Sequence, residues 1–249
     1  MRLFKREYNL SNADEIHQRT LHKNLEFTAL EQYKLLRANL EFTIPEGTKC
    51  PIIGVTSSIR GEGKSTTSIN LSFVLAEKGS RVLLIDGDLR LPSVAKKMGI
   101  ENAPGLTNML MGQCEKTLED FKSDILDTWY IMPSGDIPPN PSELLGSSRM
   151  GTLLETLGEQ FDYIVVDLPP VNIVSDALSI SGMTSGMVLV IREKYTEKKE
   201  LKRCYRQLKM SNANILGCVL AGVDSAGSSY SKYKKYKYYK YYKKSEYHE

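Results

Sequence analysis

The chain has 249 residues, of which 41% are hydrophobic and 25% charged, and its formal net charge is +3. These proportions are typical of a globular protein and exclude a fibrous chain or one that is disordered throughout. No apolar run approaches the roughly 20 residues of a transmembrane helix, and the charged opening MRLFKREYNLSNADE lacks the apolar stretch of a signal peptide. The four cysteines are widely spaced, which argues against disulfides and a zinc site. We therefore expect a cytosolic protein.

The distribution of charge separates the C-terminus from the rest of the chain. Residues 230–249 contain seven lysines and two glutamates and so carry +5, which leaves −2 on the remainder. The same segment holds eight of the 14 tyrosines and no Leu, Ile, Val or Met. Because it has no apolar face to bury, we predict a disordered, tyrosine- and lysine-rich tail over residues 229–249.

In chain order, the first predicted element is an amphipathic helix over residues 27–42, where apolar residues recur at helical spacing. Its polar side carries Glu31, Lys34 and Arg37. Residues three positions apart share one side of a helix, so these charges form either an ordinary solvated face or a contact between subunits. We expect an N-terminal extension over residues 1–25 and the folded domain over residues 26–228.

Strand-like and helix-like segments alternate along that domain. β-branched runs predict strands over residues 52–56, 82–86, 163–167, 186–191 and 215–223. Helical patterns lie between them, over residues 64–78, 142–160 and 197–210. Residues 92–129 look irregular, apart from a short helix near 106–111. Short apolar strands separated by helices predict an α/β three-layer sandwich with a mostly parallel sheet.

A glycine-rich turn, within GVTSSIRGEGKSTTSINLS (54–72), connects the first predicted strand to the next helix. Gly61 and Gly63 allow backbone N–H groups to turn toward phosphate oxygens, and the helix N-terminus adds its positive end. Lys64 is expected to reach the β- and γ-phosphates of a nucleotide, and the Ser65 hydroxyl to bind magnesium. The predicted ATP site comprises Ser58, Arg60, Gly61, Glu62, Gly63, Lys64, Ser65 and Thr66. The usual pattern has its first glycine where this chain has Ser58.

Acidic residues follow two more of the predicted strands. Asp86 and Asp88 are two positions apart, so their side chains point the same way if the chain stays extended. Asp167 closes a later strand, before two prolines. Because the carboxyl ends of parallel strands line one crevice, we expect the three carboxylates to converge on the P-loop. The prediction is an ATP and Mg²⁺ site, with Ser65, Asp86 and Asp167 as metal ligands.

The segments GEGKST (61–66), LLIDGDLR (83–90) and IVVDLPP (164–170) together resemble the deviant-Walker P-loop ATPases. Within that superfamily, DLRLP (88–92), SGDIPPNPSELL (134–145) and the tyrosine cluster are similar to the bacterial tyrosine kinases of capsular and exopolysaccharide synthesis, in their form as a separate cytosolic chain. The resemblance runs from the helix near Phe27 to the tail. It implies a P-loop kinase domain that phosphorylates itself on tyrosine with ATP.

The resemblance also assigns roles to residues. It makes Lys64 and Ser65 the phosphate and magnesium ligands, Asp86 and Asp88 the second motif peculiar to these kinases, and Asp167 the Walker B residue. The family's E-x-x-R-x-x-R motif of ring-like self-assembly falls on Glu31, Lys34 and Arg37, with lysine in place of the central arginine.

The chemistry of transfer points to the acidic pair. A tyrosine hydroxyl, with a pKa near 10, needs a neighbouring carboxylate to accept its proton. Asp86 or Asp88 can do this; we favour Asp86, with Asp167 holding magnesium through water. The predicted catalytic residues are therefore Lys64, Asp86 and Asp88. The predicted acceptors are the tail tyrosines Tyr230, Tyr233, Tyr236, Tyr238, Tyr239, Tyr241, Tyr242 and Tyr247, and we expect transfer between subunits because a tail reaches its own crevice only by folding back.

Two other functions fit parts of the sequence. A P-loop ATPase switch or scaffold of the partitioning type would use the same core motifs without kinase activity. A nucleic-acid arm would explain lysines among aromatic residues, but the mildly acidic body offers no basic groove to continue it, so we expect no nucleic-acid partner.

The resemblance alone names the partners. They are other copies of the chain in a ring, the cytosolic segment of a membrane-spanning polysaccharide co-polymerase that activates the kinase, and a phosphotyrosine phosphatase. The chain would then be cytoplasmic and held at the inner face of the membrane by its activator.

Overall fold

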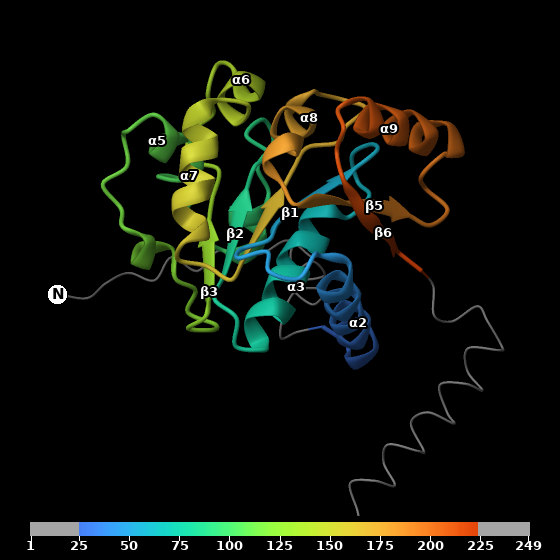
Figure 1. Ribbon diagram of the computed structural model, residues 1–249, viewed down its shortest axis with the longest axis horizontal. Helices are drawn as coiled ribbons and strands as arrows, with labels where there is room; N and C mark the ends of the chain where they lie inside the picture. Colours follow the sequence, from blue (N-terminus) through green and yellow to red (C-terminus); the bar gives the residue numbers. More distant parts are fainter. Residues whose placement is uncertain (1–24, 224–249) are drawn as a thin grey trace, which may run out of the picture.

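A computed structural model of the chain describes residues 25–223 (Figure 1). The predicted tail, with all eight acceptor tyrosines, lies outside the described residues, as does nearly all of the predicted N-terminal extension. Among the described residues, no helix combines the length and apolar character needed to cross a membrane.

Six strands form one sheet in the order β3-β2-β4-β1-β5-β6, and every neighbouring pair is parallel. Their bounds are β1 Ile52–Ser57, β2 Val82–Asp86, β3 Trp129–Met132, β4 Tyr163–Asp167, β5 Gly186–Arg192 and β6 Ile215–Ala221. The predicted parallel α/β sheet is confirmed. β3 was missed, because four residues give too short a pattern to identify.

Helices cover both faces of the sheet (Figure 1). They are α2 Phe27–Thr43, α3 Lys64–Glu77, α4 Val94–Met98, α5 Leu106–Leu110, α6 Pro141–Leu145, α7 Ser148–Gly158, α8 Asp176–Ile180 and α9 Lys198–Met210, with 3₁₀ turns at Leu118–Phe121 and Ser181–Met183. The prediction of one helix over residues 142–160 was wrong. The helix ends at Gly146, and the Ser147 hydroxyl then accepts a hydrogen bond from the Met150 N–H and caps a new one. The stretch 92–129, predicted as irregular, also contains α4.

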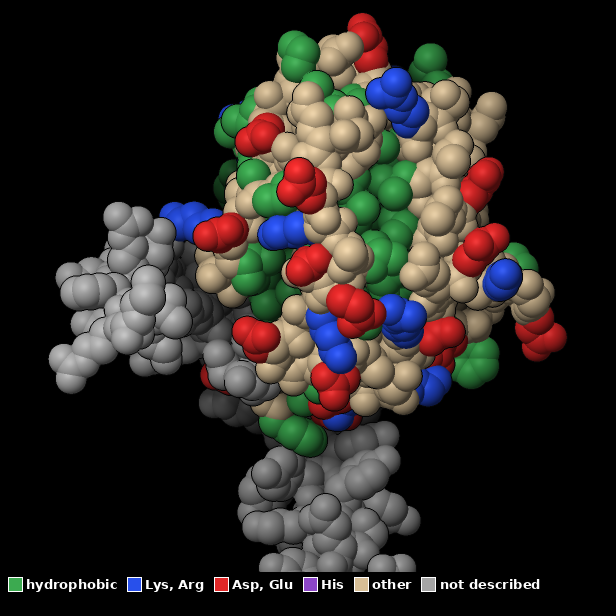
Figure 2. Space-filling model, turned by 90° about the vertical axis from the view of Figure 1, so that its left-hand side faces the viewer, with side chains coloured by type: hydrophobic (Ala, Val, Ile, Leu, Met, Phe, Trp, Pro, Cys, Tyr) green, Lys and Arg blue, Asp and Glu red, His purple; other side chains and the backbone are tan. Residues whose placement is uncertain are grey.

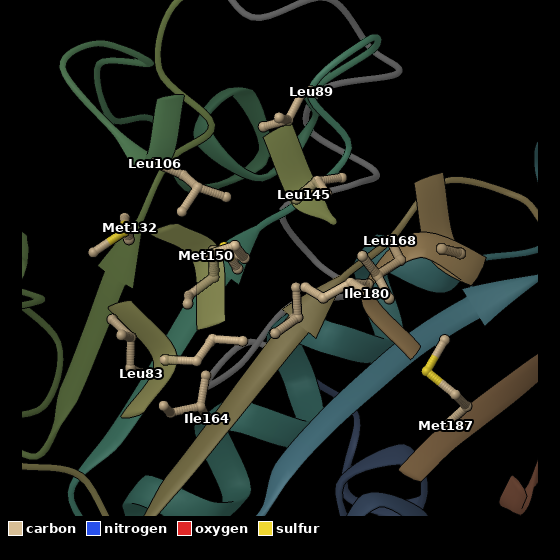
Figure 3. Packing of buried hydrophobic residues seen from close by; sticks show 14 of the residues in the cluster. Leu83, Leu89, Leu106, Met132, Leu145, Met150, Ile164, Leu168, Ile180 and Met187 are labelled. Atoms are coloured by element: carbon tan, nitrogen blue, oxygen red, sulfur yellow. The ribbon is translucent and has the colours of Figure 1, made fainter. Parts of the chain in front are cut away.

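Alternate residues of each strand supply two separate hydrophobic cores. In β2, Val82 and Leu84 pack on the side of α3, whereas Leu83 and Ile85 pack on the side of α7. Figure 3 shows the second core, in which Leu83, Ile164 and Met187 from three strands meet side chains from the covering helices. Because both faces are buried, the strands read as continuous apolar runs without alternation.

Helix α3 is enclosed on two sides, since the sheet lies against one side and α2 packs against the other. This explains why most of its residues are buried, including polar ones. Leu40 of α2 is buried, and the half-buried Leu30, Tyr33 and Leu36 pack against the same core, so the predicted helix is confirmed with these residues on its inner side. Phe42, which the helical spacing placed with them, is instead exposed.

The face opposite the β6 edge mixes charges of both signs. Figure 2 shows acidic and basic side chains interspersed around a strip of hydrophobic side chains. That face therefore presents no continuous field of one sign.

Candidate active site

The P-loop connects the end of β1 at Ser57 to the start of α3 at Lys64. Two of its glycines adopt left-handed backbone conformations, Gly61 with φ +80° and Gly63 with φ +95°. Non-glycine residues rarely adopt such angles, so these two positions let the chain reverse and enter the helix. Lys64 thus becomes the first residue of α3, at the positive end of its dipole.

Three carboxylates meet beside this loop, as the sequence predicted. Asp86 ends β2 and Asp167 ends β4, and the two are direct partners in the register of neighbouring strands. Asp88 follows two residues after β2, and its Oδ2 lies 2.8 Å from Nζ of Lys64. Both side chains of this ion pair are largely shielded, at 12% and 6% exposure.

Asp86 and Asp88 have different hydrogen-bond partners, and the extended chain on which a shared direction depended does not continue through both residues. The strand ends at Asp86 and the chain turns, and Leu91 N–H donates to Asp88 Oδ1 over 3.1 Å. Gly87 lies against the backbone of β4, where its N–H donates to the Asp167 carbonyl over 2.8 Å. A Cβ at this position would lie 2.9 Å from the backbone oxygen of Asp167, closer than real Cβ atoms approach.

Asp86 accepts hydrogen bonds from three backbone N–H groups. Oδ2 accepts from Ser93 and Val94, each over 3.0 Å, and Oδ1 accepts from Asp88 over 3.2 Å. The carboxylate therefore fastens the start of α4 to the end of β2. Burial, with the nearby Asp167 carboxylate, raises the pKa of Asp86 to about 7.

Asp167 is fully buried and only partly satisfied. Its Oδ1 accepts from the Ser68 hydroxyl over 3.0 Å, and the Ser65 hydroxyl also hydrogen bonds to the carboxylate. Its Oδ2 has no hydrogen-bond partner within the described part of the chain. Burial raises the pKa of Asp167, while Lys64 and the two serines oppose that rise.

The unpartnered Asp167 oxygen fits a missing ligand. A buried carboxylate oxygen without a donor is costly, whereas a cation or a cation-bound water would satisfy it. Ser65 lies beside it, and the Ser65 hydroxyl accepts from Ser93 Oγ over 2.8 Å. Hydroxyl and carboxylate oxygens are ligands that Mg²⁺ prefers. Ser65 and Asp167 are therefore suitable magnesium ligands, with Asp86 next to them in register.

The other residues predicted to contact the nucleotide belong to the P-loop or to the first turn of α3. Ser58 is buried, and its hydroxyl has no hydrogen-bond partner among residues 25–223. Arg60 is exposed, and Thr66 is half-buried in the first turn of α3. Glu62 is buried, and its Oε2 accepts from Ile59 N–H over 2.9 Å. Its carboxylate thus closes the loop on itself rather than facing solvent.

The segment after β5 supports the P-loop from outside. Arg192 Nη1 donates to the Gly61 carbonyl over 2.9 Å, and the Tyr195 hydroxyl donates to the Arg60 carbonyl over 3.1 Å. Thr196 donates to the carboxylate of Glu62. None of these supports was expected from the sequence, because the residues lie more than 130 positions from the loop they hold.

The predicted oligomerisation residues are engaged within the chain itself. Glu31 and Lys34 form an ion pair at 3.0 Å on α2. Arg37 donates to the backbone carbonyl of Val74 on α3. Arg37 thus joins α2 to α3 within one copy.

Comparison with known proteins places this site in a family. Residues 50–210 match the AAA domain family. The chain is 37% identical over 194 residues to the tyrosine-protein kinase YwqD of Bacillus subtilis, which covers 77% of this chain and 80% of YwqD. The chain belongs to the bacterial tyrosine-protein kinases. It is also 36% identical over 217 residues to the tyrosine-protein kinase CpsD of Streptococcus pneumoniae serotype 4, which covers 84% of this chain and 91% of CpsD.

Solved structures agree with this bacterial tyrosine-protein kinase assignment. The kinase domain of the Escherichia coli tyrosine kinase ETK superposes with a TM-score of 0.73 at 32% identity, covering 81% of this chain and 79% of that one. The chimerical protein CapA2B2 gives 0.74 at 30% identity, covering 82% and 89%. MinD of Pyrococcus horikoshii, complexed with Mg-ADP, gives 0.56 at 25% identity over 73% of each chain. The predicted P-loop fold is therefore confirmed.

Proposed function

We propose that this tyrosine-protein kinase transfers the γ-phosphate of ATP to tail tyrosines of a neighbouring copy, and thereby regulates the synthesis or export of a capsular or exopolysaccharide. The observation that carries the proposal is the cluster at the strand ends. A lysine at the start of α3 is ion-paired to one carboxylate, and two more carboxylates lie alongside. One of their oxygens has no hydrogen-bond partner in the part of the chain that the structure describes. This donor set suits a magnesium nucleotide.

Different residues of the site would bind the phosphates and the magnesium ion. The P-loop N–H groups and Lys64 would hold the β- and γ-phosphates, and Ser65 and Asp167 would hold magnesium, with Asp86 beside them. Bound magnesium would neutralise phosphate charge as the transferred group leaves ADP. The tyrosine oxygen forms the new bond to the γ-phosphorus, the bond to the β-phosphate oxygen breaks, and ADP departs with that electron pair.

The proton of the tyrosine hydroxyl goes to a carboxylate of the acidic pair. We propose Asp86 as this base, because its carboxylate ends β2 directly beside Asp167 and close to Lys64. Asp88 is the alternative, because it lies within 2.8 Å of Lys64 and so close to the expected phosphate position. Separate Asp86→Asn and Asp88→Asn variants compare them, since the base is the residue whose loss lowers transfer more, by about 10²–10⁴-fold.

The tail is the proposed acceptor because it combines tyrosines with positive charge. Seven lysines would be attracted to an acidic, nucleotide-loaded neighbour. Each phosphate adds about −1.5 to −2, so full modification would change the tail from +5 to roughly −7 to −11. Attraction would then become repulsion. We propose an assembly that forms when the tail is unmodified and loosens as phosphate accumulates.

The proposal includes three kinds of protein partner: other copies of the chain, an activator and a phosphatase. Contacts through Glu31, Lys34 and Arg37 would build a ring of copies, an activator with a cytosolic segment would hold the kinase at the membrane, and a phosphatase would reverse the modification. The similarity to CapA2B2, a chimera of two components by its name, supports a second protein partner. The intramolecular bond of Arg37 to Val74 means that a ring contact through this arginine must share it or break that bond.

A mixing experiment tests transfer between subunits. One full-length chain carries Lys64→Met with its tail intact, and the other carries eight Tyr→Phe changes in the tail with its site intact. With Mg-ATP and an activating partner, we expect phosphotyrosine on the Lys64→Met tail only after mixing. If nucleotide binds but neither the wild-type tail nor the Lys64→Met tail gains phosphate, the proposed tyrosine transfer is wrong and the site only hydrolyses ATP. Labelling of wild type but not of the mixture would indicate transfer within one subunit.

A further inference from the structure

An arginine beyond the acidic pair is fastened to a buried aspartate on another element. Arg90 donates from Nε to Asp176 Oδ2 over 2.9 Å and from Nη2 to Asp176 Oδ1 over 3.1 Å. The Asp176 side chain is 0% exposed at the start of α8, whereas Arg90 is 41% exposed. Paired parallel bonds of this kind fix the guanidinium in both position and orientation.

Ser142 hydrogen bonds to both members of this ion pair. Its hydroxyl donates to Asp176 Oδ1, and it accepts from Arg90 Nη2 over 3.3 Å. Ser142 belongs to α6, so three segments far apart in the sequence meet here. Asp176 therefore has the donors that a buried carboxylate needs, and the loop after β2 is tied to both α6 and α8.

The bonds of Arg90 to Asp176 and Ser142 restrain the turn that carries Asp88. Asp88 Oδ1 accepts from Leu91 N–H over 3.1 Å, so residues 88–91 form a closed turn with Arg90 inside it. Asp88 Oδ2 faces Lys64 at 2.8 Å. Fixing Arg90 therefore limits how far Asp88 can move relative to the phosphate-binding lysine. In the part of the chain that the structure describes, Arg90 and Asp176 form no hydrogen bond or ion pair with Lys64 or the P-loop.

We propose that Asp176 is a positioning residue for phosphoryl transfer and acts through Arg90 to hold Asp88 against Lys64. The inference rests on the proposed kinase chemistry. A lysine at position 90 would keep the positive charge but lose the paired geometry, because an ammonium group cannot present two fixed parallel donors. The effect is expected on the rate of transfer rather than on nucleotide binding, since the P-loop contacts are untouched.

The test compares Arg90→Met, Arg90→Lys, Asp176→Asn and the double variant Arg90→Met/Asp176→Asn in the full-length chain. The matched control is Arg81→Met. Arg81 lies just before β2, is similarly exposed at 39%, and pairs with Glu119 at 3.2 Å. The readouts are kcat and KM for ATP in tail phosphorylation, the Kd of Mg-ADP, and the midpoint of thermal unfolding.

We expect Arg90→Met and Asp176→Asn each to lower kcat by about 10- to 100-fold, the loss that a misplacement near 1 Å brings. KM for ATP and the Kd of Mg-ADP should change less than about threefold, and Arg90→Lys should fall between Arg90→Met and wild type. The double variant should lose no more than the worse single change, because the two residues act as one unit. The control should retain wild-type kcat.

Three results would overturn the inference. The first is a wild-type kcat in Arg90→Met, and the second is a loss of kcat in the double variant that equals the product of the two single losses. The third is a loss of Mg-ADP affinity as large as the loss of kcat. If Asp176→Asn does not fold, Arg90→Met and Ser142→Ala decide the question by the same kcat-against-KM comparison. A wild-type chain that binds Mg-ADP but phosphorylates no tyrosine would contradict the proposed function instead, so the two failures remain distinct.

Discussion

Lys64 Nζ lies 2.8 Å from Asp88 Oδ2, in a pair that is almost closed to solvent. Burial would lower the pKa of this lysine, but Asp167 and Asp88 outweigh that effect and raise it. The lysine expected to hold the nucleotide is thus engaged by the protein itself. It must exchange part of its contact with the carboxylate for a phosphate when ATP binds, with Asp88 remaining beside it.

This exchange predicts opposite effects of Asp88→Asn on binding and on transfer. Without the competing carboxylate, ATP affinity should rise by about 3- to 10-fold, within the range of one ordinary hydrogen bond. Tail phosphorylation should fall at least about tenfold, because Asp88 no longer positions Lys64. Isothermal titration and single-turnover assays measure the two effects. Glu119→Gln, which breaks a surface ion pair elsewhere, is the control. Weaker ATP binding in Asp88→Asn would mean that Asp88 supports the site rather than competes for Lys64.

The Asp86 carboxyl should make the nucleotide-free protein less stable as pH rises. Its folded pKa of about 7 lies above the ordinary value of 3.8, so the folded state holds a proton that the unfolded state releases. The stability from this proton is fully present below about pH 4 and is lost as pH rises through about 7. Asp86→Asn should therefore flatten the fall in unfolding temperature between pH 5 and 8. Asp127→Asn, at a side chain that is 95% exposed, should leave it unchanged. Equal slopes in wild type and Asp86→Asn would disprove the raised pKa.

Gly105 is predicted to tolerate no side chain. A Cβ there would lie 2.2 Å from the Pro133 carbonyl oxygen and 2.5 Å from Gly135 N, and both are backbone atoms. Gly105→Ala should destabilise the protein by about 1–3 kcal/mol or more, the cost of overpacking. Gly151→Ala is the matched control, because nothing lies within 4 Å of its Cβ and it sits inside α7. That change should stabilise by about 0.5–1 kcal/mol. Urea unfolding measures both, and opposite signs are required.

The chain's only tryptophan should be a major contributor to the core on the α3 side. Trp129 is fully buried, packs edge-on against Phe73 at 5.6 Å between ring centroids, and donates from Nε1 to Ser72 Oγ over 3.0 Å. Trp129→Ala should cost about 3–5 kcal/mol in the free energy of unfolding. Leu35→Ala, at a residue that is 54% exposed, should cost less than about 0.5 kcal/mol. Circular dichroism follows both transitions, and a loss below 1 kcal/mol at Trp129 would show that the core closes around the gap.

Much of the architecture could be predicted from local patterns. Five of the six strands, the helix on each side of the P-loop strand and the strand-end positions of Asp86 and Asp167 follow from apolar runs and their spacing. Strand β3 could not be predicted, because Trp129–Met132 is stabilised by pairing with β2 rather than by a pattern of its own. The break at Gly146 depends on a serine cap, whose effect in the sequence is weaker than the apolar periodicity that spans it.

The sequence by itself determined the chemistry of this protein: a phosphate-binding turn, three aspartates at strand ends and a set of tail tyrosines as candidate acceptors. Only the tertiary structure decided which group each side chain serves. Asp86 fastens α4, Asp88 faces Lys64, Asp167 retains an unsatisfied oxygen, and Asp176 reaches Arg90 across 86 positions of sequence. The reason is physical. Residue type and local spacing fix what a side chain can do, but its partners are set by the register of neighbouring strands and by turns that bring distant segments into contact.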